Sequence, residues 1–358
     1  MSKEYTALGL MSGTSGDGVD ASIVKSNGTN KYTVILDKYF KYNDDIYENI
    51  HKLKEGISSS KDLKILSKEI AKLEKKITIF HSEIVTNLSN ANFDMVGFHG
   101  QTIFHNASEK ISKQLGDGKL LSQLIKKDVV YNFRENDLQN GGQGAPLAPI
   151  FHKLIVEQKK ISLPVSILNI GGIANLTSLK NNNIIFSSDI GPGNCLIDKW
   201  IRANSKKNFD KDGLLAKSGK INKIILNQTM ENFHYSIEQN KSYDINDFDI
   251  SFVRGLSIED GAATLTELTA EIIAKISLDN KTFVCGGGRK NKFLLERIQK
   301  KINGKIELID NLGINGDFVE SQAFAYISIR SFLGLPISFP GTTGIKEAQS
   351  GGTIVKVK

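Results

Sequence analysis

The sequence predicts an α/β protein made of two domains that share one architecture, and three observations lead to this prediction. The chain has 358 residues, which exceeds the ~100 to 200 residues of a typical domain and is enough to bury two cores. Three strand-like segments open the chain, and three more follow in the same pattern from residue 165. In both sets a glycine-rich turn joins the first strand to the second, so we expect an internal repeat.

The composition is that of a folded globular chain, with 40% hydrophobic and 24% charged residues. No apolar run reaches the ~18 residues that span a bilayer, and the first residues lack a signal-peptide pattern, so we expect a soluble cytoplasmic protein. The two cysteines, Cys195 and Cys285, are too few for a disulfide framework and lack the spacing of zinc ligands.

The chain is basic, with 46 Lys and Arg against 39 Asp and Glu and a net charge of +7. A basic chain could bind nucleic acid. We discount this because the lysines from Lys52 to Lys76 alternate with acidic residues, as on a solvated helix face. The charge is also compatible with a small anionic ligand such as a nucleotide.

Residues 5–11, 20–25 and 32–39 are predicted to be strands, because β-branched and aromatic residues are enriched in each. Asn27-Gly28, between the second and third, indicates a tight hairpin, since a type I′ turn needs positive φ. The first turn is the segment SGTSGDG, from Ser12 to Gly18. It holds more glycine and hydroxyl groups than a hairpin requires, which indicates a ligand-binding role.

Apolar residues recur every three or four positions from Asp62 to Leu88, which predicts a long helix with one buried face. That face could pack on the sheet of its own domain or on a coiled-coil partner. A short strand at 95–99 is predicted to end in a polar loop, HGQTIFH, at residues 99–105.

The second half repeats this order. Strands are predicted at 165–169, 174–179 and 184–189, with turns at Gly171-Gly172 and at 181–183. Helices are predicted at 194–202, 261–276 and 290–301, and a strand at 282–285 leads into Gly286-Gly287-Gly288. Two such domains would set their glycine turns face to face across a cleft that clamps a nucleotide.

The segment NGGQGAPLAP, Asn140–Pro149, is the candidate domain junction, because its glycines permit a turn and its prolines stiffen the chain after that turn; otherwise it is an ordinary surface loop. We expect domain I to span residues 1–132 and domain II to span 133–344. Residues 345–358 could return to domain I.

Glycine-rich loops bind phosphates because their backbone N–H groups can approach closely. The first turn fits this chemistry, although it is neither a Walker A loop nor a dinucleotide fingerprint. Its candidate cofactor-binding residues are Gly13, Thr14, Ser15, Gly16, Asp17, Gly18, Val19 and Asp20. Two further loops are expected to surround the same nucleotide: NIGGIAN, with Gly171, Gly172 and Asn175, and CGGG, with Gly286 and Gly287.

The carboxylates of Asp17 and Asp20 would repel phosphates unless a cation lay between them and the phosphates. Mg²⁺ is therefore implied, with Asp17 as its candidate ligand.

Asp189 is the candidate general base, because it is predicted to end a strand where the chain turns toward a helix. It could instead cap that helix or form a turn. His99, Gln101 and Thr102 offer an imidazole, an amide and a hydroxyl to a carbohydrate, or are structural. Glu320 opens a predicted helix and could be a first-turn acid favoured by the helix dipole.

Seven segments, from Gly9 to Pro336, carry a resemblance: GLMSGTSGDGVDA, GFHGQT, FRENDLQNGGQGAPLAPIFH, LNIGGIANLT, SDIGPGNCLID, VCGGGRKN and ESQAFAYISIRSFLGLP. Together they resemble the anhydro-N-acetylmuramic acid kinases of bacterial peptidoglycan recycling. The resemblance implies two RNase H-like domains of the actin/hexokinase type flanking a nucleotide cleft, and a homodimer. It also implies that ATP phosphorylates the 6-oxygen of 1,6-anhydro-N-acetylmuramic acid while water opens the anhydro bridge.

The same resemblance implies roles for the candidate residues. Asp189 would activate the water and Glu320 would help to place it. The loop 13–20 would hold the ATP phosphates, His99 and Thr102 would contact the sugar, and Gly286 and Gly287 would hold adenosine.

Two departures from the family pattern bear on the site. The segment Gln239–Phe248 keeps only Lys241, Ser242 and Phe248 of a longer family motif, and Gly16 stands where the family often has a larger residue. A kinase of the same fold for another sugar or a carboxylate therefore stays open, as does an ATP-gated binding protein. A nuclease of RNase H-like topology is disfavoured, because no grouping of about four carboxylates for two metals is apparent.

Overall fold

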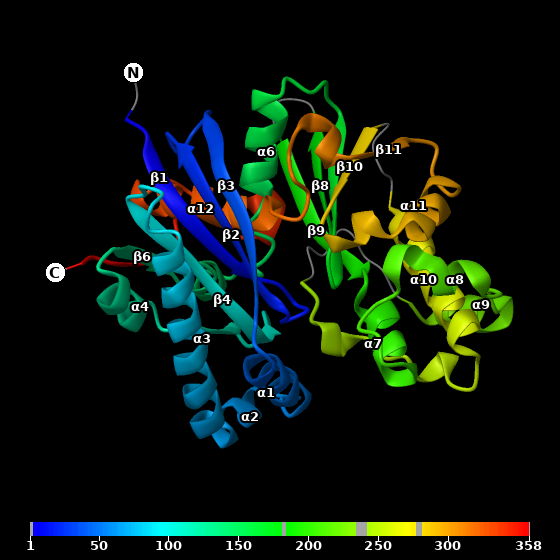
Figure 1. Ribbon diagram of the computed structural model, residues 1–358. Helices are drawn as coiled ribbons and strands as arrows, with labels where there is room; N and C mark the ends of the chain where they lie inside the picture. Colours follow the sequence, from blue (N-terminus) through cyan, green and yellow to red (C-terminus); the bar gives the residue numbers. More distant parts are fainter. Residues whose placement is uncertain (1–2, 181–183, 234–241, 277–280, 358) are drawn as a thin grey trace. The chain divides into compact units, whose positions relative to one another are not determined.

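The computed structural model describes residues 3–180, 184–233, 242–276 and 281–357 (Figure 1). The chain divides into two compact units, each described below by itself. Unit 1 comprises Met1–Ile161 and Phe318–Lys358, and unit 2 comprises Ser162–Asp317. The chain thus leaves unit 1 after residue 161 rather than 132, and returns at 318 rather than 345. The segment Asn140–Pro149 lies inside unit 1 and not at its boundary.

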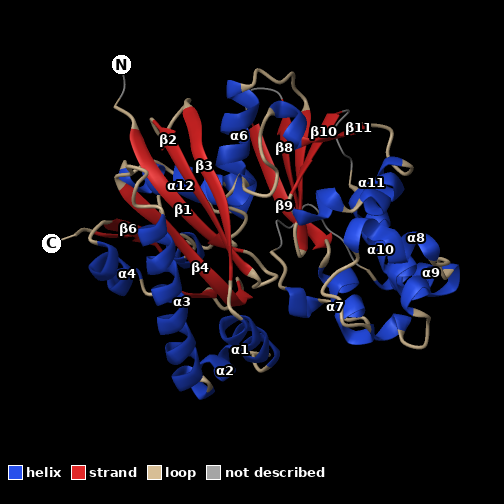
Figure 2. Cartoon of the chain, viewed as in Figure 1, coloured by secondary structure: helices blue, strands red, loops and turns tan. Residues whose placement is uncertain are grey.

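Unit 1 is built on a seven-stranded sheet with the order β12-β6-β4-β1-β2-β3, in which β5 also pairs with β4 (Figure 2). Its strands are β1 (Tyr5–Ser12), β2 (Gly18–Ser26), β3 (Tyr32–Lys41), β4 (Met95–Asn106), β5 (Ile111–Leu115), β6 (Asp128–Tyr131) and β12 (Thr353–Val355). The first three are antiparallel neighbours, β4 runs parallel to β1, and β6 runs parallel to β4. The three predicted opening strands are confirmed.

The predicted polar loop at residues 99–105 is wrong, because β4 continues to Asn106 and forms an antiparallel hairpin with β5. Polar residues in this segment concealed a strand whose second half pairs with a neighbour that the sequence did not predict. Gln101 is fully buried, and Ile103 and Phe104 are buried with it.

The helices of unit 1 are α1 (Asp44–Glu55), α2 (Ser60–Ile65), α3 (Ser67–Asn87), α4 (Gly118–Ile125), α5 (Glu135–Gln139), α6 (Pro149–Gln158), α12 (Val319–Phe332) and α13 (Pro340–Thr343). The single helix predicted from Asp62 to Leu88 is in fact two, because Leu66 leaves helical geometry with φ −90° and ψ 17°. The apolar stripe of α3, including Ile70, Leu73 and Ile77, is buried in the core of its own unit. Packing within the domain, rather than on a coiled-coil partner, therefore accounts for the stripe.

Helix α12 belongs to unit 1 because it packs closely on β1 and β2. A Cβ placed on Gly9 of β1 would overlap the Ser321 carbonyl oxygen, so only glycine permits this approach. The hydroxyls of Ser22 and Ser321 lie 2.7 Å apart in the interface. Gln322 Nε2 donates to Asp37 Oδ2 at 2.9 Å.

Unit 2 is built on a five-stranded sheet with the order β11-β10-β7-β8-β9. Its strands are β7 (Val165–Ile170), β8 (Ile173–Lys180), β9 (Ile184–Pro192), β10 (Lys281–Cys285) and β11 (Lys305–Leu308). The first three are antiparallel neighbours, β10 is parallel to β7, and β11 is parallel to β10. This order and these directions repeat those of β6-β4-β1-β2-β3, which confirms the two predicted RNase H-like α/β domains of the actin/hexokinase type. The predicted turn at 181–183 lies outside the described residues.

The helices of unit 2 are α7 (Cys195–Asn204), α8 (Leu214–Ser218), α9 (Lys223–Asn232), α10 (Ile258–Lys275) and α11 (Lys292–Gln299). Helix α10 is buried on two sides. Leu265 and Leu268 join a cluster with Trp200 of α7, whereas Ala270 and Ile273 join the core beneath the sheet. Among the described residues of both units, no helix combines the length and apolarity needed to cross a membrane.

Candidate functional site

The turn between β1 and β2 is held by hydrogen bonds to its carbonyl groups. Gln101 Nε2 donates to the Gly13 carbonyl at 3.0 Å, and Lys54 Nζ donates to the Thr14 carbonyl at 2.9 Å. The Asp17 carbonyl accepts from the Tyr42 N–H at 2.9 Å. We call residues 13–17 the phosphate loop, after the role that the sequence analysis predicts for them.

These contacts fix the direction of the loop's N–H groups. A trans peptide is planar, so a carbonyl that points into the protein turns the next N–H outward. The N–H groups of Thr14 and Ser15 are oriented in this way, and both residues are exposed. Gly16 closes the turn with φ +63° and donates its N–H to the Gly13 carbonyl at 3.1 Å. The N–H groups of Thr14 and Ser15 are thus accessible from solvent, as binding of an anion would require.

Asp17 fits a magnesium ion that is shared with phosphates. Its side chain is exposed beside the loop, and Oδ1 accepts from the Ser15 hydroxyl at 2.5 Å. Within the described residues, no three His, Cys, Asp or Glu side chains gather into a metal-binding cluster. Mg²⁺ commonly takes one or two carboxylates together with substrate phosphates and water, and such a set needs no protein cage.

Gln101 lies beneath the phosphate loop. Its Oε1 accepts from the Ser12 hydroxyl at 2.6 Å, while its Nε2 holds the Gly13 carbonyl. Because the side chain is fully buried and both of its polar atoms are paired, Gln101 positions the loop. Thr102 accepts at Oγ1 from Gln114 Nε2 at 3.2 Å and is half-buried.

His99 is buried and neutral. Burial, and then the positive charge of Arg134, lower the pKa of His99 to about 3. Its Nδ1 lies 2.8 Å from the Gly100 carbonyl, so this nitrogen carries the proton, and Nε2 accepts from Arg134 Nη2 at 3.0 Å. His99 therefore holds Arg134, a functional candidate that the sequence analysis missed. Arg134 lies in FRENDLQNGGQG, within a segment that carries the family resemblance, and this was the signal in the sequence that pointed to it.

The glycines of that same segment are held by a buried aspartate. Asp137 Oδ2 accepts from the Gly144 N–H and Oδ1 from the Thr343 hydroxyl, both at 2.6 Å. Arg134 Nη1 also donates to the Gly144 carbonyl at 2.9 Å. The backbone of this segment is therefore held in place next to Arg134.

Glu320 lies in the first turn of α12, where the helix dipole favours an acid. The side chain is half-buried, and the next two residues anchor the helix to β2 and β3 through Ser22 and Asp37. Glu320 is thus carried on a rigid element of unit 1.

In unit 2, polar side chains form a row across neighbouring strands. Asn169 of β7 pairs in register with Asn175 of β8, and Asn175 pairs with Asp189 of β9. Directly paired residues share one face of a sheet. The structure therefore brings the candidate base to the level of the predicted Gly171-Gly172 turn.

The predicted strand end at Asp189 is wrong. Strand β9 runs on to Pro192, and α7 begins only at Cys195. The register shifts here, since Ala174 pairs with Gly191 and Asn175 with Asp189, so Ile190 forms a bulge. Bulges of this kind often redirect a side chain next to an active site.

Asp189 is oriented by the segment that departs from the family pattern. Its Oδ2 accepts from the Tyr243 N–H at 3.0 Å and from the Ser242 hydroxyl at 3.3 Å. Burial, followed by the charge of Asp189, raises the pKa of Tyr243. Residues 239–241 of that segment, including Lys241, lie outside the described residues.

The Gly171-Gly172 turn is docked on the start of α7. The Gly172 carbonyl accepts from the Gly193 N–H and the Gly171 carbonyl from the Asn194 N–H, each at 2.9 Å. A Cβ on Gly193 would overlap the Gly171 carbonyl, so the close approach requires glycine.

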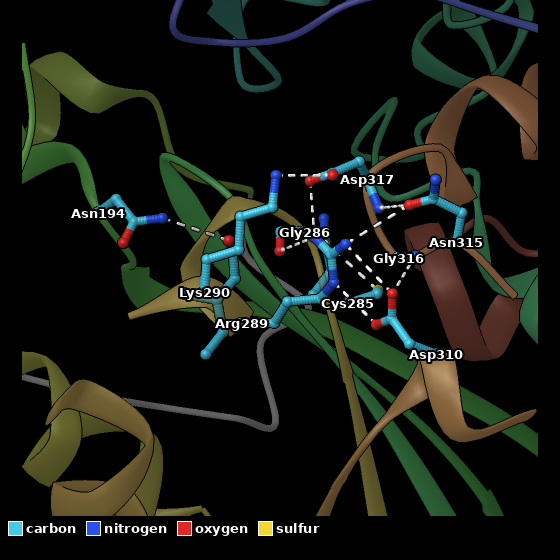
Figure 3. Close-up of polar contacts among 11 residues, drawn as sticks. Asn194, Cys285, Gly286, Arg289, Lys290, Asp310, Asn315, Gly316 and Asp317 are labelled. Atoms are coloured by element: carbon cyan, nitrogen blue, oxygen red, sulfur yellow. Dashed lines mark hydrogen bonds and ion pairs between the residues drawn. The ribbon is translucent and has the colours of Figure 1, made fainter. Parts of the chain in front are cut away.

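The Gly286–Gly288 turn is fixed by an arginine that the sequence analysis did not single out (Figure 3). Arg289 Nη1 donates to the Gly286 carbonyl at 3.2 Å and to Asp317 Oδ1 at 2.6 Å, and Nε donates to Asp310 Oδ2 at 2.9 Å. Burial opposes ionisation of both aspartates, but hydrogen bonds and charge from Arg289 outweigh it and lower their pKa values. Gly287 is open on its Cβ side, where a ligand can approach.

The sequence of the chain matches one family of known proteins over almost its whole length. A profile of the anhydro-N-acetylmuramic acid kinase family matches residues 5–357. The anhydro-N-acetylmuramic acid kinase of Pelagibacter ubique is 54% identical over 99% of this chain and 100% of that protein. That of Agrobacterium fabrum is 35% identical over 99% and 100%. At this level of similarity the chain is a sugar kinase. It belongs to the anhydro-N-acetylmuramic acid kinase family.

Solved structures resemble the chain only weakly. A ROK family glucokinase from Streptomyces griseus, in complex with glucose and AMPPNP, has a TM-score of 0.41 and 12% identity over 89% of this chain and 98% of its own. The activator of the 2-hydroxyisocaproyl-CoA dehydratase from Clostridium difficile, with bound ADPNP, has a TM-score of 0.42 and 14% identity over 90% and 94%. Similarities this weak carry no inference about activity.

Proposed function

We propose that the protein uses ATP and water to convert 1,6-anhydro-N-acetylmuramic acid to N-acetylmuramic acid 6-phosphate and ADP, as a step of peptidoglycan recycling. Full-length membership of the family supports the substrate class. The observation that carries the chemistry is Asp189, a carboxylate fixed through Oδ2 beside a glycine turn.

In this reaction Asp189 accepts a proton from a water molecule as the water oxygen bonds to the anomeric carbon. The bond from that carbon to the bridging 6-oxygen breaks, and the released oxygen bonds to the γ-phosphorus as ADP leaves. The proton then passes from Asp189 to solvent. Glu320 helps to orient the water.

The remaining candidates bind and orient the reactants. Outward N–H groups of the phosphate loop, with Gly18, Val19 and Asp20 behind it, bind ATP phosphates. Gly171, Gly172 and Asn175 serve the phosphates from unit 2, and Gly286 and Gly287 hold adenosine. Asp17 would hold Mg²⁺ in part, and the ion would supply positive charge to the phosphates.

Thr102 and Arg134 would contact the sugar, and His99 would act on the sugar site through Arg134. Because His99 is neutral and both ring nitrogens are engaged, we assign it to holding Arg134 rather than to proton transfer. The Arg134 guanidinium would then donate hydrogen bonds to the lactyl carboxylate of the sugar.

A second candidate function is a kinase of the same fold for another sugar. The divergent segment Gln239–Phe248 is the reason to test it, because this segment reaches the proposed base through the hydroxyl of the retained Ser242 and the backbone N–H of Tyr243. The predicted homodimer and cytoplasmic location stay predictions.

The test is ADP release from ATP·Mg²⁺ with and without 1,6-anhydro-N-acetylmuramic acid, and with N-acetylmuramic acid and N-acetylglucosamine as comparison sugars. Release that depends on the anhydro sugar supports the proposal. Preference for a comparison sugar would favour the second candidate. ADP release that does not depend on a sugar would contradict both kinase functions and favour an ATP-gated binding protein.

A further inference from the structure

Lys54 lies beneath the phosphate loop and had no role in the sequence analysis. It stands in the last turn of α1, and only 8% of the residue is exposed. Its Nζ donates to the Thr14 carbonyl at 2.9 Å. Lysines are rarely this buried unless their charge is used, so the contact calls for an explanation.

Helix α1 supports the loop at two points on one face. Ile50 stands one turn before Lys54, and residues four apart lie on the same side of a helix. A Cβ on Gly16 would lie only 2.9 Å from Ile50 Cγ2, so the glycine lets the loop settle onto the helix. Gly16 also lacks a side chain that would restrict its backbone, and the Lys54 contact restrains the same loop two residues earlier.

The Lys54 contact acts on one particular peptide. With the Thr14 carbonyl turned toward Nζ, the Ser15 N–H points the opposite way, out of the protein. Loss of the contact would free this peptide to rotate, and the N–H would no longer be set for a phosphate. The lysine also keeps a positive charge directly behind the loop, and cationic groups of this kind favour phosphate binding.

We propose that Lys54 is a positioning residue for the nucleotide: it fixes the Thr14–Ser15 peptide and adds its charge to the site of the ATP phosphates. This inference rests on the proposed function. It assigns to α1 a role in nucleotide affinity and none in sugar binding.

The experiment compares Lys54→Met, Lys54→Gln and Lys54→Arg with Lys52→Met, an exposed lysine of the same helix turn that serves as the matched control. Affinity for a non-hydrolysable ATP analogue with Mg²⁺ is measured by calorimetry, and KM for ATP, KM for the sugar and kcat by ADP release. Circular dichroism checks folding.

We expect Lys54→Met to weaken analogue binding and to raise KM for ATP about tenfold or more, as for a lost hydrogen bond from a charged donor. KM for the sugar should change less than about twofold, because a loop that binds only ATP should not affect the binding of the sugar. Lys54→Arg, which keeps the charge, should recover most of the loss, and Lys54→Gln should not. If Lys54→Met does not fold, the Gln and Arg variants decide by the same comparison.

Equal ATP affinity of Lys54→Met and Lys52→Met would overturn the inference while the proposed function stands. A parallel loss of ATP and sugar binding would overturn it as well, because it would indicate general damage. Failure of the unaltered protein to bind the ATP analogue would overturn the proposed function first, and the role of Lys54 with it.

Discussion

Replacing Arg289 by methionine tests how the Gly286–Gly288 turn is held. The Arg289 side chain is only 7% exposed, and its partners Asp310 and Asp317 are 38% and 30% exposed. Removal of one member of a buried ion pair costs about 3–5 kcal/mol. Both aspartates can regain water, so we expect a loss at or below the lower end of this range, about 2–3 kcal/mol of unfolding free energy.

Trp200 provides the assay, because it is the single tryptophan of the chain and lies buried in unit 2. Urea unfolding followed by its fluorescence should show a midpoint lowered by about 1 M in Arg289→Met. The control is Lys290→Met, which removes an ion pair to Asp317 from a side chain that is 62% exposed. Its expected loss is below about 1 kcal/mol.

The pH dependence follows from the lowered pKa values of Asp310 and Asp317. A carboxyl group whose pKa is lower in the folded state stabilises the fold above its unfolded pKa, and this contribution is lost as the pH falls. The difference between the unaltered protein and Arg289→Met should therefore shrink on acidification below about pH 4. Equal midpoints for Arg289→Met and Lys290→Met at neutral pH would refute the reasoning.

Three further predictions concern the base, a buried histidine and a packed glycine. Asp189→Asn should abolish turnover and leave binding of an ATP analogue within about twofold, measured by calorimetry; near-full activity would exclude Asp189 as the base. Burial lowers the pKa of His81 to about 4, so the unfolded chain gains its proton first as the pH falls. Between pH 7 and pH 5 the unaltered protein should therefore lose unfolding free energy, and His81→Leu should reduce that loss by about 1–2 kcal/mol, measured by circular dichroism. An unchanged dependence of the unfolding free energy on pH would contradict this. Gly9→Ala should destabilise unit 1 by more than about 2 kcal/mol, because the new Cβ overlaps the Ser321 carbonyl; a neutral effect in thermal unfolding would refute the packing of α12 on β1.

Much of the fold could be predicted from the sequence, because hydrophobic period and turn residues act locally. The opening strands of both units and the glycine turns between them followed from such signals. Strands β5, β6 and β11 did not, since all three are short. Strands β6 and β11 pair with strands from which other elements separate them in the chain, and β5 pairs with the part of β4 that the polar residues concealed. The return of α12 to unit 1 was also missed, because the fit of Gly9 against Ser321 joins residues far apart in the chain.

The candidate site was predicted less evenly. The glycine loops and Asp189 carry recognisable sequence patterns, and the structure gives each an ordered setting. Lys54 carries no such pattern, because it acts on a backbone carbonyl far from it in the chain. Arg134 and Arg289 lie within segments of the family pattern, but their contacts with the Gly144 and Gly286 carbonyls could not be predicted from the residue types. Gln101 lies in a predicted polar segment, yet its side chain is turned inward to hold the Gly13 carbonyl.

The central claim is that one turnover couples opening of the anhydro bridge by water to phosphorylation of the sugar. The most direct measurement is the reaction of purified protein with ATP·Mg²⁺ and 1,6-anhydro-N-acetylmuramic acid in ¹⁸O-water, with mass spectrometry of the sugar product as it forms. We predict a phosphorylated product that carries one solvent oxygen on its anomeric carbon, with one ADP for each sugar. A phosphorylated sugar without solvent oxygen, or ADP release without a sugar product, would contradict the account.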